Sequence, residues 1–174
     1  MNIRQQLLRE NSRVNADIVL DYVSKTPHVL VEVMACFFSD EVTVAQRAAQ
    51  IVGDWGRLHP ESLEPWWGEM LRAAEHPVHD AICRNVSRYF SELELSLPAE
   101  LEQALVKLMA GWSSDLSTPV AATVYSMQFI ANRADRFPEE AQQVKVQIED
   151  RISTASAGFK SCGKRILRQL GERL

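Results

Sequence analysis

The most regular feature of this chain is an apolar stripe that recurs at a nearly constant distance. Val44, Ile82, Val120 and Phe159 are separated by 38, 38 and 39 residues, and mostly apolar or small residues follow each at offsets of 4, 7, 8 and 11. These offsets share one face of a helix with 3.6 residues per turn. Only Gln128, at offset 8 in the third copy, is polar. The pattern predicts four equivalent helices, each burying the same face. The other stripe residues are Ala48, Ile51, Val52 and Trp55; Val86, Tyr89, Phe90 and Leu93; Val124, Met127 and Ala131; and Gly163, Ile166, Leu167 and Leu170.

Prolines separate the predicted helices. Three segments between them combine proline with acidic residues, which are favoured in the first turn of a helix. These segments are LHPESLEPWW, LSLPAELEQAL and RFPEEAQQV. We expect Pro98 and Pro138 at first helical positions, Pro65 in the first turn of a helix that begins near Ser62, and Thr26 as an N-cap. Two further segments, KTPHVLVEVMACFF and STPVAATVY, start helices in the same way. No segment of the sequence shows the sustained alternation of apolar and polar residues that is typical of a strand. The chain is therefore predicted to be all-α, with helices near 13–25, 27–38, 42–57, 62–75, 77–94, 98–111, 118–135, 138–152 and 156–172.

Short connections between these helices imply antiparallel neighbours that stack in pairs. The period of 38 residues, the small residues of QRAAQIVGDWG and the proline between helices resemble HEAT repeats over about residues 13 to 172. This resemblance implies a right-handed α-solenoid of about four and a half helix pairs, an armadillo-type fold. We expect one domain over residues 1–174, with units near 13–38, 42–75, 77–111 and 118–152 and a terminal helix at 156–172.

Three segments resemble a narrower group. They are similar to small, uncharacterised bacterial HEAT-like proteins, some of which carry the name adenylosuccinate lyase. The three segments are HDAICRNVSRYF, PVAATVYSMQFIA and SAGFKSCGKRILRQL. The Ser-rich, Met-Pro-Lys-Asn signature loop of that lyase has no counterpart in this chain, and 174 residues are too few for its long helical bundle. The resemblance therefore implies a fold and no activity.

Composition and charge add three expectations. No apolar run approaches the roughly 20 residues of a membrane helix, and the start MNIRQQLLRENSR lacks a signal core, so we expect a cytoplasmic protein with no membrane partner. Cys36, Cys83 and Cys162 are expected to be reduced, buried thiols. The net charge of −4 conceals an asymmetry, because residues from Gly158 onward carry five Lys/Arg against one Glu. That segment has a charge of +4, and the remainder carries −8.

A cluster of possible metal ligands occurs in EHPVHDAIC. His79 and Cys83 are four residues apart, which is close enough on a helix to share a metal. The alternative is that His76 caps a helix, His79 is exposed and Cys83 packs in the core beside Ile82. We adopt the second interpretation and expect neither metal nor cofactor.

Tryptophans and arginines could form a binding surface. Trp66 and Trp67 could stack on a ligand, but helical spacing places at least one of them in the core, and Trp55 belongs to the apolar stripe. Arg84 and Arg88 are one turn apart, and Asp80 can pair with Arg84. The two arginines form either a solvated face with ordinary ion pairs or an anion contact that lines a groove between repeat units.

A Trp, Asp and Arg set acts in the HEAT-like alkylpurine DNA glycosylases, so we considered a distant relation to them. The chain has arginine at Arg84 and tryptophans at Trp66 and Trp67, but Gly68 and Glu69 follow Trp67 where the family's aspartate step would be expected. The single Asp-Trp step, Asp54 and Trp55, has its tryptophan in the core stripe. An acidic chain also opposes the phosphate contacts that DNA binding requires.

The basic C-terminal segment has two interpretations. Lys160, Lys164 and Arg168 are four residues apart, with Arg165 beside them and Arg173 further on. They supply a polar outer face for the last helix of an array, which needs one for solubility, or they form a contact patch for an acidic protein partner or nucleic acid.

These observations favour a non-catalytic scaffold that binds a protein or peptide on its concave surface. No phosphate loop, nucleophile elbow or paired catalytic carboxylate motif occurs in the sequence, so we expect no enzyme activity and assign no catalytic residue. The predicted partner-binding residues are Arg84, Arg88, Lys160, Lys164, Arg165 and Arg168. The alternative is a nucleic-acid-associated protein distantly like the glycosylases.

Overall fold

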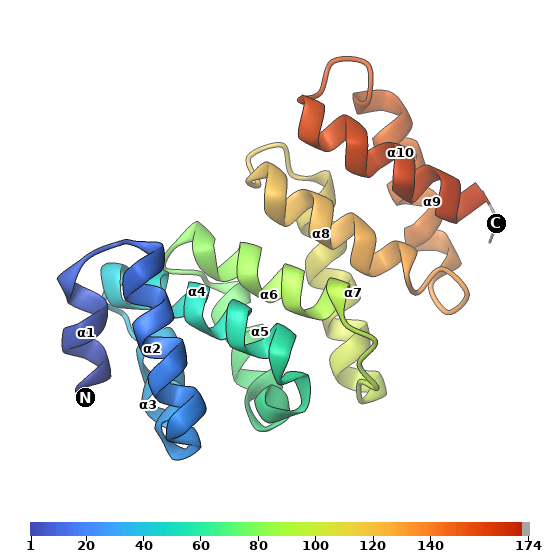
Figure 1. Cartoon of the computed structure of the whole chain (residues 1–174). Helices are drawn as coiled ribbons and strands as arrows, with labels where there is room; N and C mark the ends of the chain where they lie inside the picture. The colour runs from blue at the N-terminus through green and yellow to red at the C-terminus, as the bar shows by residue number, and fades with distance from the viewer. Residues whose placement is uncertain (172–174) are drawn as a thin grey trace. The chain divides into compact units, whose positions relative to one another are not determined.

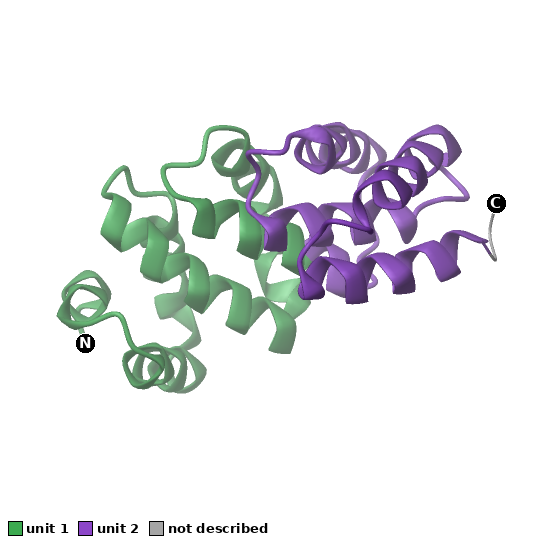
Figure 2. Cartoon of the chain, turned by 90° about the horizontal axis from the view of Figure 1, so that it is seen from above, with its two compact units in different colours: residues 1–89 green, residues 90–174 purple. Residues whose placement is uncertain are grey.

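The computed structural model describes residues 1–171, and these residues are helical without a strand (Figure 1). The all-α fold is therefore confirmed. The chain consists of two compact units, residues 1–89 and 90–174, and the boundary falls within α6 (Asp80–Glu92) (Figure 2). Within the described part of the chain, no helix is both long enough and apolar enough to cross a bilayer.

Unit 1 is built around α4 (Val42–Leu58). This helix packs against α1 (Ile3–Arg9), α2 (Arg13–Lys25), α3 (Leu30–Phe37) and the 3₁₀ helix η2 (Pro60–Trp66). The remaining elements of this unit before α6 are η1 (Pro27–Val29) and α5 (Trp67–Glu75).

Unit 2 holds the last four helices. They are α7 (Ala99–Ser114), α8 (Val120–Ala131), α9 (Pro138–Arg151) and α10 (Ala157–Gly171). Each helix packs against its successor, and α7 also contacts α9 while α8 contacts α10. Arg151 of α9 joins three of these helices, because its Nη1 donates to the Ser113 carbonyl at 3.0 Å and its guanidinium lies 4.9 Å from the Phe159 ring centroid.

Most predicted helices lie where the periodicity placed them, and the differences have local causes. The helix expected from Ser62 begins as the 3₁₀ helix η2, and regular α-helix starts only at Trp67. Pro65 explains this difference, because it has no N–H to donate to an α-helical hydrogen bond. Pro138 occupies a first-turn position as expected, whereas Pro98 is the N-cap of α7. Thr26 lies at the N-cap of η1, but its side chain makes no capping hydrogen bond.

The sequence did not predict α1. Its seven residues are too few to show a repeated stripe, but Asn2 caps the helix by accepting from the Gln5 N–H at 2.9 Å. Ile3 and Leu7 are buried on its inner face. A capping asparagine followed by two apolar residues four apart was the available signal.

The apolar stripe forms the core with one clear exception. Val120 is 50% exposed because it starts α8 immediately after Pro119, where the first turn has no neighbour to cover it. Gln128, the polar position, is half-buried and its Nε2 donates to Asn132 Oδ1 at 2.7 Å and Gln169 Oε1 at 2.8 Å. A polar residue is tolerated there because it forms hydrogen bonds between α8 and α10. Leu93 and Leu167 are half-buried, and the other stripe residues are buried.

Small residues let these helices approach closely. A Cβ built on Gly56 of α4 would lie 2.7 Å from Leu63 Cδ1 and 2.7 Å from the Tyr89 ring. A Cβ on Gly163 of α10 would lie 2.9 Å from Ile148 Cγ2, so the helices meet closely at this glycine as well. Gly111 in α7, by contrast, has no atom within 4 Å of the equivalent position.

We expect Gly56→Ala and Gly111→Ala to have opposite effects on stability. Alanine favours a helix over glycine by about 1 kcal/mol, but at Gly56 the methyl group must displace Leu63 and the Tyr89 ring, and overpacking costs about 1–3 kcal/mol. Gly56→Ala should therefore lower the free energy of unfolding, and Gly111→Ala should raise it by up to about 1 kcal/mol. Urea unfolding of the two variants measures both changes. An equal gain from both would show that the contact at Gly56 does not restrict packing.

Candidate functional site

The solvent side of α10 carries a row of basic residues. Phe159, Gly163, Ile166 and Leu170 are buried on the inner side of this helix, which packs on α8 and α9. Helical geometry then directs the intervening positions outward. We call Lys160, Lys164, Arg165 and Arg168 the basic face; with Ala157 and Ser161 they line a shallow open recess.

The basic face gathers four cations that form no ion pair with any described residue. Among the described residues, none of its four side chains forms a salt bridge or hydrogen bond. Elsewhere, Arg4 pairs with Glu41 at 2.5 Å and Lys25 with Asp21 at 2.7 Å. The structure thus brings four of the six predicted partner-binding residues together as a positive surface that has no ion-pair partner among residues 1–171. Glu172 and Arg173, counted in the basic segment, lie outside the described residues.

Arg84 and Arg88 occupy a separate place in the chain. Both lie in the part of α6 that belongs to unit 1, where Arg84 is exposed and Arg88 is half-buried. In the portion of the chain that the structure describes, no ion pair joins Arg84 to Asp80, although the four-residue spacing would allow one.

The His76, His79 and Cys83 cluster does not form a metal site. His79 Nδ1 accepts from the Ala81 N–H at 3.0 Å, so this side chain caps the start of α6 rather than being simply exposed as we had expected. His76 is exposed and is the C-cap residue of α5. No group of three His, Cys, Asp or Glu residues that could hold a metal occurs among residues 1–171.

Two of the tryptophans serve the core. Trp67 is buried and its Nε1 donates to the Tyr89 hydroxyl at 2.9 Å, and that hydroxyl donates to the Pro60 carbonyl at 2.6 Å. This chain of hydrogen bonds fixes η2 against α6, and burial raises the pKa of Tyr89 to about 12. Trp55 is buried as predicted, with its Nε1 donating to Ser62 Oγ at 2.9 Å. Trp66 is only half-buried, so the adjacent pair does not form an exposed aromatic platform.

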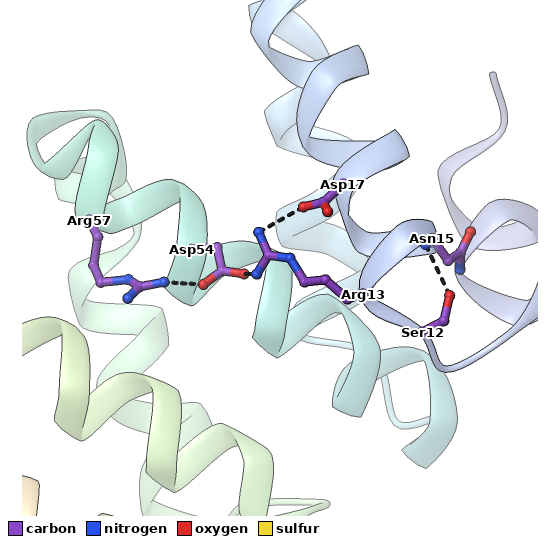
Figure 3. A network of polar contacts seen from close by, with 6 residues as sticks. All are labelled: Ser12, Arg13, Asn15, Asp17, Asp54 and Arg57. Carbon is purple, nitrogen blue, oxygen red and sulfur yellow. Dashed lines mark hydrogen bonds and ion pairs between the residues drawn. The ribbon is translucent and has the colours of Figure 1, made fainter.

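The Asp54 carboxylate joins two helices (Figure 3). Arg13 of α2 donates to its Oδ2 at 2.7 Å, and Arg57, one turn further along α4, donates to its Oδ1. The carboxylate side chain is 12% exposed, and Arg13 also pairs with Asp17 at 2.7 Å. Ser12 caps α2 beside this network by accepting from the Asn15 N–H at 3.1 Å. Because a guanidinium holds each oxygen, Asp54 acts as a link between α2 and α4 rather than as a free catalytic base.

Sequence reasoning missed a second polar site in unit 2. Glu102 of α7 is buried, and it accepts from Arg133 Nε at 2.7 Å and from Arg136 Nη1 at 2.5 Å. The available signal was the position of Glu102, three and four residues before the apolar Leu105 and Val106 and therefore on the buried face of α7. A carboxylate on a core face requires a cationic partner.

We expect Cys83 to resist alkylation in the folded protein. Burial raises the pKa of its thiol to about 11, with a further contribution from Asp80, so roughly one thiol in a thousand is ionised at pH 8. Burial also raises the pKa of Cys36, whereas Cys162 is only half-buried. Iodoacetamide labelling of the native protein at pH 8, followed by mass spectrometry, should therefore modify Cys162 first.

The pH dependence of this labelling follows from the sign of the shift. The folded state disfavours the Cys83 thiolate. The protonated thiol therefore contributes fully to the free energy of unfolding below the ordinary pKa of 9.0, and this contribution decreases as pH rises towards about 11. Labelling of Cys83 should accelerate over the same interval. Guanidinium-unfolded protein provides the control, in which all three cysteines should react alike. Equal rates for Cys83 and Cys162 in the native protein would contradict the prediction.

Comparison with known proteins adds no relative. A scan against protein-family models, a search of curated proteins and a search of solved structures each return no match to this chain. What the chain binds must therefore be inferred from its own surface.

Proposed function

We propose that this chain is a non-catalytic, HEAT-like helical-repeat scaffold that binds an acidic segment of a partner protein. The packing within each unit supports the repeat arrangement. In unit 1, α2 contacts α4, and in unit 2, α8 contacts α10 and α7 contacts α9. Stacked helix pairs produce contacts between alternate helices, because the first helix of one pair packs on the first helix of the next pair and the second helix packs on the next second helix. The partner would lie along the concave surface of such a right-handed solenoid.

The basic face of α10 is the observation that carries the proposal. Four cations on one exposed helix side, without acidic neighbours among the described residues, create a local positive potential on a chain of net charge −4. Lys160, Lys164 and Arg168 recur every four residues, about 6 Å apart along the helix axis. Acidic side chains spaced every fourth residue on a partner helix have the same repeat, so the two rows can pair along their length.

An acidic protein fits this surface better than duplex DNA does. DNA binding requires neutralisation of several phosphates over an extended surface, and the chain outside the basic segment carries −8. Nucleic acid is the second candidate, because unpaired Lys and Arg side chains also bind phosphates. A non-catalytic role agrees with Asp54, Trp55 and Trp67, whose polar atoms are engaged in structural hydrogen bonds.

We expect charge reversal of the basic face to abolish partner binding. In Lys164→Glu/Arg165→Glu/Arg168→Glu, attraction becomes repulsion at three adjacent positions, so affinity should fall at least about 100-fold. The wild-type and variant chains are used to capture partners from native lysate, with and without nuclease, and the captured partner is then titrated against both chains. The matched control reverses three exposed cations elsewhere, Arg9→Glu/Arg72→Glu/Lys107→Glu, and should retain the partner.

The outcomes separate the two candidates. A stoichiometric protein that survives nuclease, is lost with the reversed basic face and is retained by the control supports the scaffold proposal. Companions that disappear with nuclease would assign the basic face to nucleic acid. A protein partner retained equally by both triple variants would show that α10 is only the polar end of the array.

A further inference from the structure

Unit 2 contains a hollow that is separate from the basic face. It has a volume of about 500 Å³ and lies between the α6–α7 connection and the end of α8. Its lining residues are Ser91, Glu92, Leu93, Glu94, Leu95, Ser96, Asn132, Arg133 and Arg136. The volume is within the range of sites that hold a small molecule or a few peptide residues.

A buried arginine at this hollow has donors to spare. Arg133 is 6% exposed, its Nε donates to Glu102, and its Nη1 makes a long hydrogen bond of 3.4 Å to the Phe129 carbonyl. Its Nη2 makes no hydrogen bond to any described residue. The guanidinium also lies 3.7 Å from the Phe129 ring centroid, which fixes its plane. Arg133 lines the hollow, so a ligand there could use this spare donor.

Arg133 and Arg136 share one ion-pair partner. Glu102 is the only described carboxylate that pairs with Arg133 or Arg136, so two guanidinium groups share one negative charge. The Arg136 side chain is 60% exposed and keeps its Nε and Nη2 free of described partners. Glu92 and Glu94 also line the hollow, so with Glu102 the three carboxylates outnumber the two guanidinium groups, and the spare N–H donors of the arginines rather than a net positive charge favour a carboxylate ligand. A guanidinium with free N–H donors suits a carboxylate, which accepts two parallel hydrogen bonds.

The connection along the hollow offers backbone groups. Leu93, Leu95 and Leu97 are half-buried, whereas Glu94 and Ser96 are exposed. Burial that alternates with a period of two is typical of extended chain. Within the described structure, no hydrogen bond involves the backbone of residues 94–97. Unpaired N–H and C=O groups on an extended segment can add a peptide strand.

We propose that the hollow binds the C-terminal end of an extended peptide, with its free carboxylate on Arg133 Nη2 and Arg136. The peptide backbone pairs with residues 94–97, and its terminal carboxylate accepts from the spare N–H donors of the two arginines. Glu94 on the same lining favours a lysine or arginine upstream of that carboxylate. The ligand class is therefore a chain end with a basic residue before it, which differs in charge from the acidic partner of the basic face.

The test uses the full chain and two libraries of labelled random hexapeptides, one with free C-terminal carboxylates and one with C-terminal amides. Affinity capture and mass spectrometry should enrich acids over amides at least about tenfold, as expected for loss of a charged hydrogen-bonded group, with Lys or Arg upstream. The best acid peptide is then titrated by fluorescence polarisation. No enrichment of acids, or equal binding of its amide, overturns the proposal.

Three variants locate the site. Arg136→Gln is exposed, so it should fold normally and weaken the selected peptide at least tenfold, about 1.4 kcal/mol. Ser96→Pro removes one unpaired N–H and should weaken the peptide while leaving the helical circular dichroism unchanged. Lys164→Gln, on the basic face, is the matched control and should bind as the wild type does. Weakening by Lys164→Gln but not by Arg136→Gln would assign the peptide to the basic face and overturn the proposal.

Free acetate serves as a competitor in the same titration. If the backbone contacts contribute, millimolar acetate should displace the peptide only weakly from the wild-type chain and more readily from Ser96→Pro, which binds the peptide less tightly. Complete displacement of the peptide by millimolar acetate would show that the hollow binds a small carboxylate alone and would overturn the proposal of an extended peptide.

Discussion

Close approach between helices is the constraint on which the rest of this structure depends. In unit 1, α4 presents Ala45, Ala48, Ala49, Gly53 and Gly56 to its neighbours, all of them buried. In unit 2, Gly163 lets α10 approach Ile148 of α9. Small residues at such contacts give little hydrophobic burial by themselves, but they allow the larger stripe residues on either side to reach across and pack. The orientation of each helix, and hence of its polar side, follows from these contacts.

Polar groups between helices add specific links to this packing. Asp54 joins α2 to α4 through Arg13, and Glu102 joins α7 to the end of α8 through Arg133. Buried ion pairs contribute little net stability, because desolvation offsets much of the attraction, but removal of one partner leaves an uncompensated charge. The burial of Arg133 lowers the pKa of its guanidinium, and Glu102 partly reverses that effect. Such pairs fix which neighbours meet.

This distinction between paired and unpaired charges directs the functional interpretation. Most arginines in the core of each unit bond to a carboxylate or a carbonyl, as Arg47 does to the Leu7 carbonyl at 2.6 Å. The basic face of α10 and the free donors of Arg133 and Arg136 differ, because their hydrogen-bonding capacity is not used by described residues. Donors that the fold leaves unused are available to a partner, and the two places offer them in different forms. One is a row of cations on the solvent side of a helix, and the other is a guanidinium held in place by Glu102 and Phe129.

The sequence by itself determined the all-α class, the equivalent helices and the face that each buries. Periodicity carries this information because a helix with 3.6 residues per turn must bury the same offsets wherever it packs. It also placed Lys160, Lys164, Arg165 and Arg168 opposite the buried side of α10. Only the tertiary structure decided that these cations lack partners among the described residues, that Val120 is exposed and that His79 caps α6. It alone brought Glu102 to Arg133 and Arg136, more than thirty residues away. Pairing across such distances depends on which helices meet, and local periodicity does not encode that choice.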